Sequence, residues 1–90
     1  MDNAGTIRVT LKLYASLGKY LPAEKQRSNQ IEVEVPASAV MADLVAPFSV
    51  PPPACFLVLV NGVFLPPSQR PKATFADGDV VAIWPPVAGG

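Results

Sequence analysis

Residues 56–65 read FLVLVNGVFL, and this stretch decides the fold of the chain. The apolar run Phe56 to Val60 predicts a strand that is buried on both faces or central in its sheet. Asn61 and Gly62 follow it, and because both residue types tolerate a positive φ, this pair predicts a tight hairpin turn. Val63 to Leu65 then predicts a short returning strand. The sequence therefore predicts a β-hairpin to which the other strands must be added.

Beyond the hairpin, several prolines make the chain irregular until a second turn signal, Asp77-Gly78-Asp79. Val80 to Trp84 follows directly and predicts the final strand. Proline cannot donate to a sheet ladder, so Pro85-Pro86 ends this strand and continues the chain in an extended conformation. We therefore expect a folded domain over residues 1–84 and an extended, flexible tail over residues 85–90.

The first part of the chain predicts two strands, over residues 7–13 and 31–35, in which apolar and polar residues alternate. Their outer faces carry charges of opposite sign: Arg8 and Lys12 on the first, Glu32 and Glu34 on the second. Antiparallel pairing would place these charges face to face, at roughly 0.2–1 kcal/mol per pair. Such pairs help to set the register of the two strands.

One main helix is predicted between these strands and the hairpin. Ser38 is a candidate N-cap for a helix that begins near Ala39, and Pro47 limits it to little more than two turns. Apolar residues share one side of this helix: Val40, Met41, Leu44 and Val45. A helical turn is expected over residues 16–21, and the prolines at 51–53 predict a stiff extended connector. A sheet with one helix packed across it, an α+β arrangement, buries these faces economically.

The composition excludes several classes of function. Seven basic and seven acidic residues give a formal net charge of zero, which argues against nucleic acid as the main partner. The chain has no histidine and one cysteine, so it cannot form a Ser-His-Asp or Cys-His catalytic arrangement or a zinc site of His and Cys. We expect no bound metal or cofactor. A single cysteine also makes no internal disulfide, which favours a reducing, cytoplasmic setting.

The sequence shows no signal for a membrane. The N-terminus lacks the pattern of a signal peptide, and no apolar segment approaches the roughly 20 residues of a membrane helix. Cys55 precedes a strand expected to be buried and has no basic neighbour to lower its pKa, so we expect an unreactive core or edge thiol, with a sulfur-relay thiol as the alternative. Arg70 and Lys72 are expected to be solvated loop charges, with contact to an acidic partner surface as the alternative.

Three signals stand in series: Val60-Asn61-Gly62, then Asp77-Gly78-Asp79-Val80-Val81, then Pro85-Pro86-Val87-Ala88-Gly89-Gly90. Together they resemble the small sulfur carriers of the MoaD/ThiS family, which include the small subunit of molybdopterin synthase and the thiamine-biosynthesis carrier. The resemblance implies a ubiquitin-like β-grasp fold of class α+β. This fold has a mixed four- to five-stranded sheet, one main helix packed across it and a flexible C-terminal diglycine tail. The double proline before the last four residues is similar to the molybdopterin-synthase branch.

The resemblance implies a sulfur carrier whose reactive group is the terminal carboxylate of Gly90. In this family a ubiquitin-activating-type adenylyltransferase uses ATP to form an acyl-adenylate, and sulfur then replaces the adenylate to give a thiocarboxylate. The thiocarboxylate donates sulfur inside a larger catalytic subunit, which for molybdopterin synthase serves the molybdenum or tungsten cofactor. The chain would then be a non-catalytic carrier by itself and the small subunit of a synthase-type complex.

The tail has the properties that this role requires. Gly89 has no side chain, so Gly90 can enter a narrow channel, and six extended residues reach on the order of 20 Å. Phe64, Phe75 and Trp84 are expected mostly in the core, with some of the apolar surface beside the tail available to dock the partners. The candidates for this docking surface are Phe64, Phe75, Trp84, Pro85, Pro86 and Val87.

Three alternatives remain open from the sequence. The chain could carry sulfur for thiamine or another metabolite. It could be a ubiquitin-like modifier that is conjugated to lysines through Gly90. It could also be a plain interaction module with an inert tail.

Overall fold

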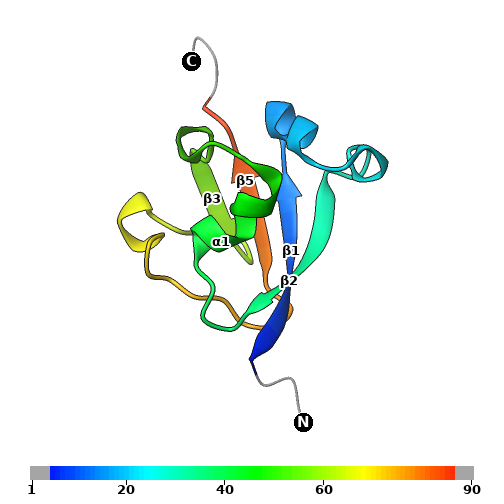
Figure 1. Cartoon of the computed structure of the whole chain (residues 1–90). Coiled ribbons are helices and arrows are strands. Elements are labelled where there is room, and N and C mark those ends of the chain that lie inside the picture. Colours follow the sequence, from blue (N-terminus) through cyan, green and yellow to red (C-terminus); the bar gives the residue numbers. More distant parts are fainter. Residues whose placement is uncertain (1–4, 87–90) are drawn as a thin grey trace.

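The structure, a computed structural model, describes residues 5–86 of the chain. This part contains five strands and one α-helix (Figure 1): β1 (Thr6–Leu13), β2 (Gln30–Pro36), α1 (Met41–Val45), β3 (Leu57–Val60), β4 (Val63–Phe64) and β5 (Val80–Trp84). Short 3-10 helices connect them: η1 (Ala15–Tyr20), η2 (Ala23–Lys25), η3 (Ala46–Phe48), η4 (Pro52–Ala54) and η5 (Pro67–Gln69). The order of the strands and the main helix is the one that the sequence predicts.

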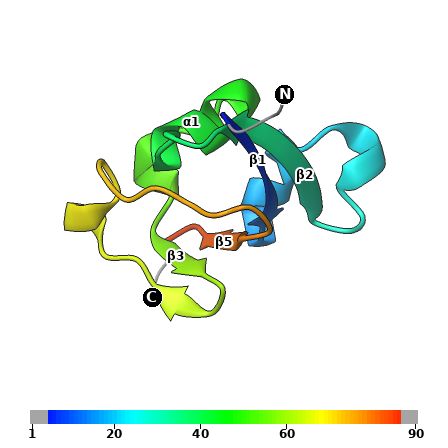
Figure 2. The same ribbon diagram turned by 90° about the horizontal axis from the view of Figure 1, so that it is seen from below.

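The five strands form one mixed sheet in the order β2-β1-β5-β3-β4. β1 and β5 are parallel, and the other neighbouring strands are antiparallel. Figure 2 shows α1 on one side of this sheet. A five-stranded mixed sheet with its first and last strands side by side and one helix across it is the ubiquitin-like β-grasp fold. The predicted fold class is therefore confirmed.

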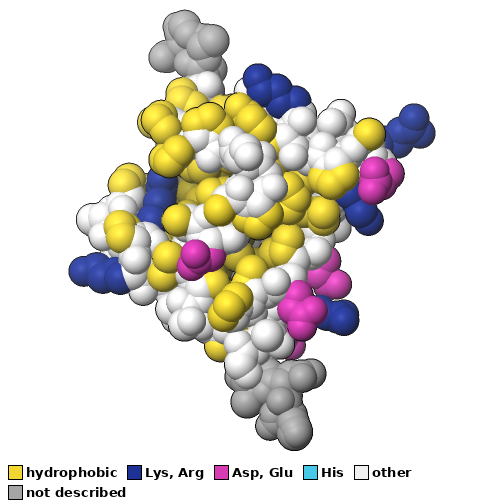
Figure 3. Space-filling model, viewed as in Figure 1, with side chains coloured by type: hydrophobic (Ala, Val, Ile, Leu, Met, Phe, Trp, Pro, Cys, Tyr) yellow, Lys and Arg dark blue, Asp and Glu magenta, His cyan; other side chains and the backbone are white. Residues whose placement is uncertain are grey.

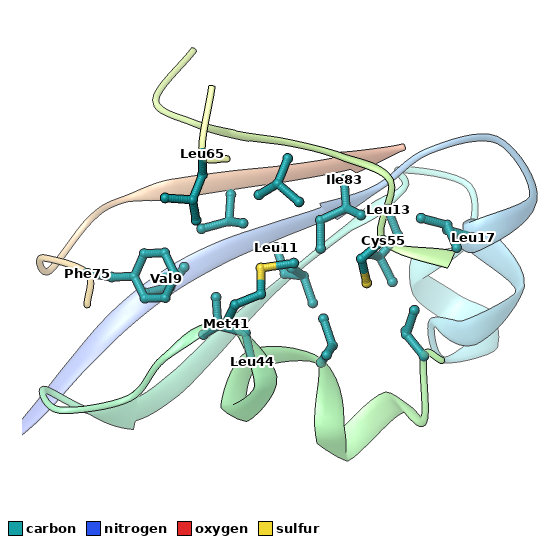
Figure 4. Close-up of a cluster of buried hydrophobic side chains, with 14 of the residues drawn as sticks. Val9, Leu11, Leu13, Leu17, Met41, Leu44, Cys55, Leu65, Phe75 and Ile83 are labelled. Atoms are coloured by element: carbon teal, nitrogen blue, oxygen red, sulfur yellow. The ribbon is translucent and has the colours of Figure 1, made fainter. Parts of the chain in front are cut away.

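The core lies between the sheet and α1 (Figure 4). The apolar positions of β1 are fully buried: Val9, Leu11 and Leu13. Met41 and Leu44 of α1 contribute the opposite wall, and Val58 and Ile83 contribute from β3 and β5. Each such side chain stabilises the fold by about 1.5–3 kcal/mol through burial. The period of two in β1 thus decides which of its faces meets the helix.

β1 and β2 pair antiparallel, as the sequence predicts. Arg8 lies opposite Glu34, but its guanidinium pairs diagonally with Glu32, at 3.6 Å between Nη1 and Oε1. Lys12 lies opposite Gln30 instead of a carboxylate. Because both side chains of the Arg8–Glu32 pair are more than half exposed, this pair contributes little to stability.

The start of α1 differs from the prediction. The helix begins at Met41 instead of near Ala39, and its N-cap is Val40 instead of Ser38. The Val40 N–H donates to Asp43 Oδ2 at 2.8 Å, so a carboxylate inside the first turn satisfies a free N–H at the helix start. The α-helix ends at Val45, and Pro47 lies within the 3-10 helix η3 that follows, in agreement with the predicted stop.

The proline run 51–53 is extended only at its first residue. Pro51 has an extended backbone, and Pro52 begins the 3-10 helix η4. Proline is tolerated at the first position of a helical turn because its missing N–H would have no partner there. The N–H groups of Ala54 and Cys55 donate to the carbonyls of Pro51 and Pro52. The prediction of an extended connector is therefore wrong beyond Pro51.

β3 is central in its half of the sheet, between β5 and β4, but it is not buried on both faces. Val58 is fully buried, whereas Leu57 and Leu59 are partly exposed, because α1 covers one face only. Phe56 lies just before β3 and is 63% exposed. Within residues 5–86, no helix has the length and apolar character needed to cross a membrane.

Candidate functional site

The base of the predicted tail is fixed to the sheet. β5 ends at Trp84, as predicted, and Pro85 and Pro86 are the last described residues. The Trp84 carbonyl accepts a hydrogen bond from the Phe56 N–H at 3.0 Å, so the ladder with the β3 segment continues to the end of β5. Val87 to Gly90 lie outside the described residues. What is expected of Val87, Gly89 and Gly90 therefore stays a prediction.

An aromatic pair lies at this end of β5. The rings of Tyr14 and Trp84 stack with centroids 4.4 Å apart and planes 8° apart. Tyr14 directly follows β1, and its N–H donates to the Ile83 carbonyl at 3.0 Å. Because β1 and β5 are parallel, their carboxyl ends lie at the same edge of the sheet. The tail therefore begins beside Tyr14.

The face of the sheet away from α1 carries apolar side chains beside the tail. Opposite Trp84 of β5 lies Leu57 of β3, and opposite Leu59 of β3 lies Phe64 of β4. Residues directly opposite in an antiparallel pair point to the same face, and Val58 between the two leucines points into the core. These four residues, Leu57, Leu59, Phe64 and Trp84, form what we call the outer patch.

The outer patch is accessible and adjoins a polar half of the same face. Phe64 is 53% exposed, and the other three side chains are partly exposed. The neighbouring strands β1 and β2 present Lys12 and Glu32 on this face. An exposed apolar surface bordered by charged residues is typical of protein docking sites. The arrangement suits the binding of another protein next to the origin of the tail.

The structure separates the predicted docking residues into two groups. Phe64, Trp84, Pro85 and Pro86 lie at or beside the outer patch and are at least partly exposed. Phe75 is 8% exposed and belongs to the core, where Figure 4 shows it next to Val9. Its candidate place in a docking surface is therefore wrong, because its side chain is buried within the hydrophobic core cluster.

Sequence reasoning missed Leu57, Leu59 and Tyr14. The two leucines belong to a run that is apolar at every position, so periodicity gives no sign that one face is open. Their register against Phe64 and Trp84 identifies them, and that register exists only in the folded sheet. Tyr14 follows a predicted strand, but its stacking partner lies near the other end of the sequence.

The two predicted turns lie together and are structural. Asn61 and Gly62 both have positive φ, 51° and 84°, which confirms the hairpin turn. The Asn61 side chain donates to Asp79 Oδ1 and accepts from the Val80 N–H, both at 2.9 Å. The side chain of Asp77 accepts from the Arg8 N–H at 2.8 Å. These bonds hold the hairpin, the second turn and β1 together at the start of β5, the end of this strand that lies away from the tail.

Arg70 is bound to the backbone instead of being solvated as predicted. Its guanidinium donates to the carbonyls of Cys55 at 2.8 Å, Phe56 at 3.0 Å and Leu65 at 3.1 Å. It therefore joins the segment before β3 to the segment after β4. The alternative of an acidic partner is also disfavoured, because three of its N–H groups already face backbone carbonyls.

A pocket of about 470 Å³ opens between α1 and η4, lined mainly by apolar side chains together with Cys55 and Arg70. Figure 3 shows hydrophobic side chains gathered on this face of the molecule. Burial raises the pKa of the Cys55 thiol, and the nearby Arg70 lowers it to a smaller extent. The expectation that Cys55 has no basic neighbour is thus wrong, because Arg70 lies near it in the folded chain. The expectation of an unreactive thiol is still favoured, since a raised pKa keeps the thiol protonated and a protonated thiol is a poor nucleophile.

Within residues 5–86, no group of three or more Cys, Asp or Glu side chains is placed to hold a metal ion.

Comparisons with known proteins agree with this fold. The Haloferax volcanii HVO 2177 protein is 23% identical, with a TM-score of 0.71 over 100% of this chain and 92% of that one. A putative molybdopterin converting factor, subunit 1, from Pyrococcus furiosus is also 23% identical, with a TM-score of 0.57 over 90% of this chain and 99% of that one. SAMP1 from Haloferax volcanii is 28% identical, with a TM-score of 0.57 over 92% and 99% of the two chains.

The search of curated proteins found no significant match. The family model described as the ThiS family matches residues 15–90, which is most of the chain. The match includes the strands that carry the outer patch and the segment with the double proline and the diglycine. The chain therefore belongs to the ThiS family, whose members share the ubiquitin-like fold seen here.

Proposed function

We propose that this chain is a sulfur carrier in which the carboxylate of Gly90 is adenylated and then converted to a thiocarboxylate. Membership of the ThiS family supports this proposal. The observation that carries it is the position of the outer patch: β5 ends at Trp84, which itself belongs to the patch, and the tail begins at the next residue. A protein that docks on the patch is therefore held beside the tail.

The proposed chemistry has two steps, and the partners supply its catalytic groups. First, a Gly90 carboxylate oxygen attacks the α-phosphate of ATP in a ubiquitin-activating-type adenylyltransferase, and pyrophosphate leaves. A hydrosulfide ion supplied by the partner then attacks the acyl carbon, AMP leaves with the carboxylate oxygen that it has gained, and loss of the S–H proton gives the thiocarboxylate. Gly89 allows the reacting end to enter a narrow channel because it has no side chain. The folded domain contributes the docking surface and the starting point of the tail.

We further propose that the client is molybdopterin synthase, with this chain as its small subunit beside a larger catalytic subunit. The sequence PPVAGG at residues 85–90 supports this choice, since it is similar to the molybdopterin-synthase branch. The likeness to the Pyrococcus furiosus converting-factor subunit is a likeness of fold. ATP would be used by the activating partner and would not be a resident cofactor of this chain.

A second candidate is a ubiquitin-like protein modifier. The 28% identity to Haloferax volcanii SAMP1 favours it, and a related SAMP1 from Methanosarcina acetivorans is a small archaeal modifier protein. Both candidates need an adenylated Gly90 and differ in the acceptor of the activated acyl group. A carrier for thiamine or another metabolite uses the same first step.

Deletion of Gly90 tests the shared first step. We expect the deleted chain to keep its fold, because the core lies within residues 5–86, and to lose ATP–pyrophosphate exchange with an adenylyltransferase from its own host. The matched control is Gly5→Ala, which changes a glycine with open space around it and should exchange like the wild type. Exchange that persists without Gly90 would contradict both the carrier and the modifier.

Intact-mass measurement of the chain from its host separates the candidates. A carrier should show a form that is heavier by the mass difference between sulfur and oxygen. A modifier should appear as a conjugate with lysine-containing proteins. A chain that shows neither form, and no exchange with any adenylyltransferase of its host, would be an interaction module instead.

A further inference from the structure

We propose that Tyr14 is a positioning residue for the tail: its ring stacks on the Trp84 ring and so orders this side chain at the point where the chain leaves β5. The inference rests on the proposed function, because an ordered tail base matters only if the tail must enter another protein.

Backbone hydrogen bonds hold the end of β5, and a stacking partner holds the Trp84 ring. On the β3 side its carbonyl accepts from the Phe56 N–H at 3.0 Å, and Arg70 in turn holds the Phe56 carbonyl at 3.0 Å. On the β1 side the register of the parallel pair ends at Leu13 opposite Ile83. Tyr14 is the next residue after Leu13, and its ring stacks on the Trp84 ring with centroids 4.4 Å apart.

The backbone around Tyr14 is arranged to keep this ring in place. Its N–H donates to the Ile83 carbonyl at 3.0 Å, so its Cα is tied to β5 one residue before Trp84. The next residue, Ala15, has a φ of 53°, which alanine adopts rarely. This turn takes the chain away from the sheet directly after Tyr14 and into η1. A residue in such a strained conformation persists only where the surrounding structure stabilises it. Here the strained residue, Ala15, directly follows the stacked Tyr14.

The Tyr14–Trp84 stack affects the base of the tail because the tail begins at the residue after Trp84. Pro85 follows Trp84 directly, and the proline ring fixes its φ near −65°. Ordering of the Trp84 side chain therefore extends to the base of the tail at Pro85. A tail whose base is already ordered loses less conformational freedom when a partner captures it. Without the Tyr14 ring, the backbone of β5 would keep its bonds to the Phe56 and Tyr14 N–H groups, but the Trp84 ring would lose its stacking partner.

Fluorescence tests the stack without any partner, because Trp84 is the only tryptophan of the chain. In Tyr14→Ala we expect a fast component in the anisotropy decay of Trp84 that the wild type lacks. Tyr14→Phe preserves the aromatic face and should decay like the wild type. Tyr20→Ala is the matched control, since Tyr20 is half-buried and lies on the same 3-10 helix region. A Tyr14→Ala protein with wild-type decay and wild-type melting temperature would overturn the proposal.

Binding to the host adenylyltransferase tests the effect on the tail. We expect Tyr14→Ala to weaken binding of the full chain by about 3–10-fold, with kcat of adenylation unchanged, because more order must be imposed on capture. In a chain truncated after Pro86, the same substitution should leave the affinity equal to that of the truncated chain with Tyr14. Equal weakening in both backgrounds would make Tyr14 a docking contact and overturn its positioning role.

The two proposals fail in different experiments. A wild-type chain that no host adenylyltransferase activates overturns the proposed function, and the positioning role with it, whatever the anisotropy shows. A wild-type chain that is adenylated, combined with unchanged binding in Tyr14→Ala, overturns the positioning role alone.

Discussion

Arg70 links two segments through the backbone. Its three donors reach the carbonyls of Cys55 and Phe56 before β3 and of Leu65 after β4. The planar guanidinium can address several acceptors at fixed angles, which a lysine ammonium cannot do. Arg70 therefore closes the base of the hairpin on the side that supports Trp84.

Replacement of Arg70 should lower stability even when the charge is kept. We expect Arg70→Lys to reduce the free energy of unfolding by about 1–3 kcal/mol, because two partly buried carbonyls, those of Cys55 and Leu65, and the exposed carbonyl of Phe56 lose their donors. Urea denaturation measures this change. Lys72→Ala, an exposed charge on the same loop, should change it by less than about 0.5 kcal/mol. An Arg70→Lys protein as stable as the wild type would mean that the three bonds contribute nothing.

At the level of elements, the fold depends on two turns that bind each other. The hairpin turn between β3 and β4 contributes Asn61, and the turn before β5 contributes Asp79. The Gly78 N–H donates to the Arg8 carbonyl at 2.7 Å, and the Thr10 N–H donates to the Asp79 carbonyl at 2.9 Å. The turn before β5 thereby sets the register of the parallel pair β1 and β5.

Gly78 tests how strongly this turn depends on its backbone conformation. Its φ is 90°, and a Cβ built there meets no atom within 4 Å, so any effect of Gly78→Ala arises from the backbone alone. We expect a loss of about 1–2 kcal/mol in the free energy of unfolding, as for a side chain forced into the left-handed region. Gly5→Ala also meets open space and should be nearly neutral. Equal midpoints of thermal denaturation for Gly78→Ala and Gly5→Ala would contradict this expectation.

At the level of the whole molecule, the two faces of the sheet have different tasks. One face is closed by α1 over the core, and the other carries the outer patch beside the origin of the tail. In the proposed function, a partner on the outer patch would reach the origin of the tail at Pro85 without disturbing the core. β4 shows this division in two adjacent residues, since Val63 lies opposite Val60 and Phe64 lies opposite Leu59.

Val63 and Phe64 provide a matched test of the docking face. Both are highly exposed, at 69% and 53%, but they point to opposite faces of the sheet. We expect Phe64→Glu to weaken binding to the adenylyltransferase at least tenfold, because a charge at the centre of an apolar contact is desolvated on binding. Val63→Glu should bind like the wild type. Calorimetric titration measures both, and equal loss in the two variants would place the docking surface elsewhere.

The sequence by itself determined the order of the strands and the main helix, the two turns, and the ends of α1 and β5. Asn61-Gly62 and Asp77-Gly78 specify turns because few residues adopt positive φ, and the prolines after Trp84 end β5 because they lack an N–H. These effects are local, so they can be read without the fold. The three signals in series resemble the MoaD/ThiS family, and the match of the ThiS family model confirms this resemblance.

Only the tertiary structure decided which apolar residues face outward and what the polar ones bind. Phe75 and Phe64 are chemically alike, yet one fills the core and the other lies on the outer patch, because a single helix covers one face of the sheet. Arg70 and Tyr14 acquire their partners from segments distant in sequence. Strand register and the packing of α1 create these contacts, and neither is contained in the local pattern of residues.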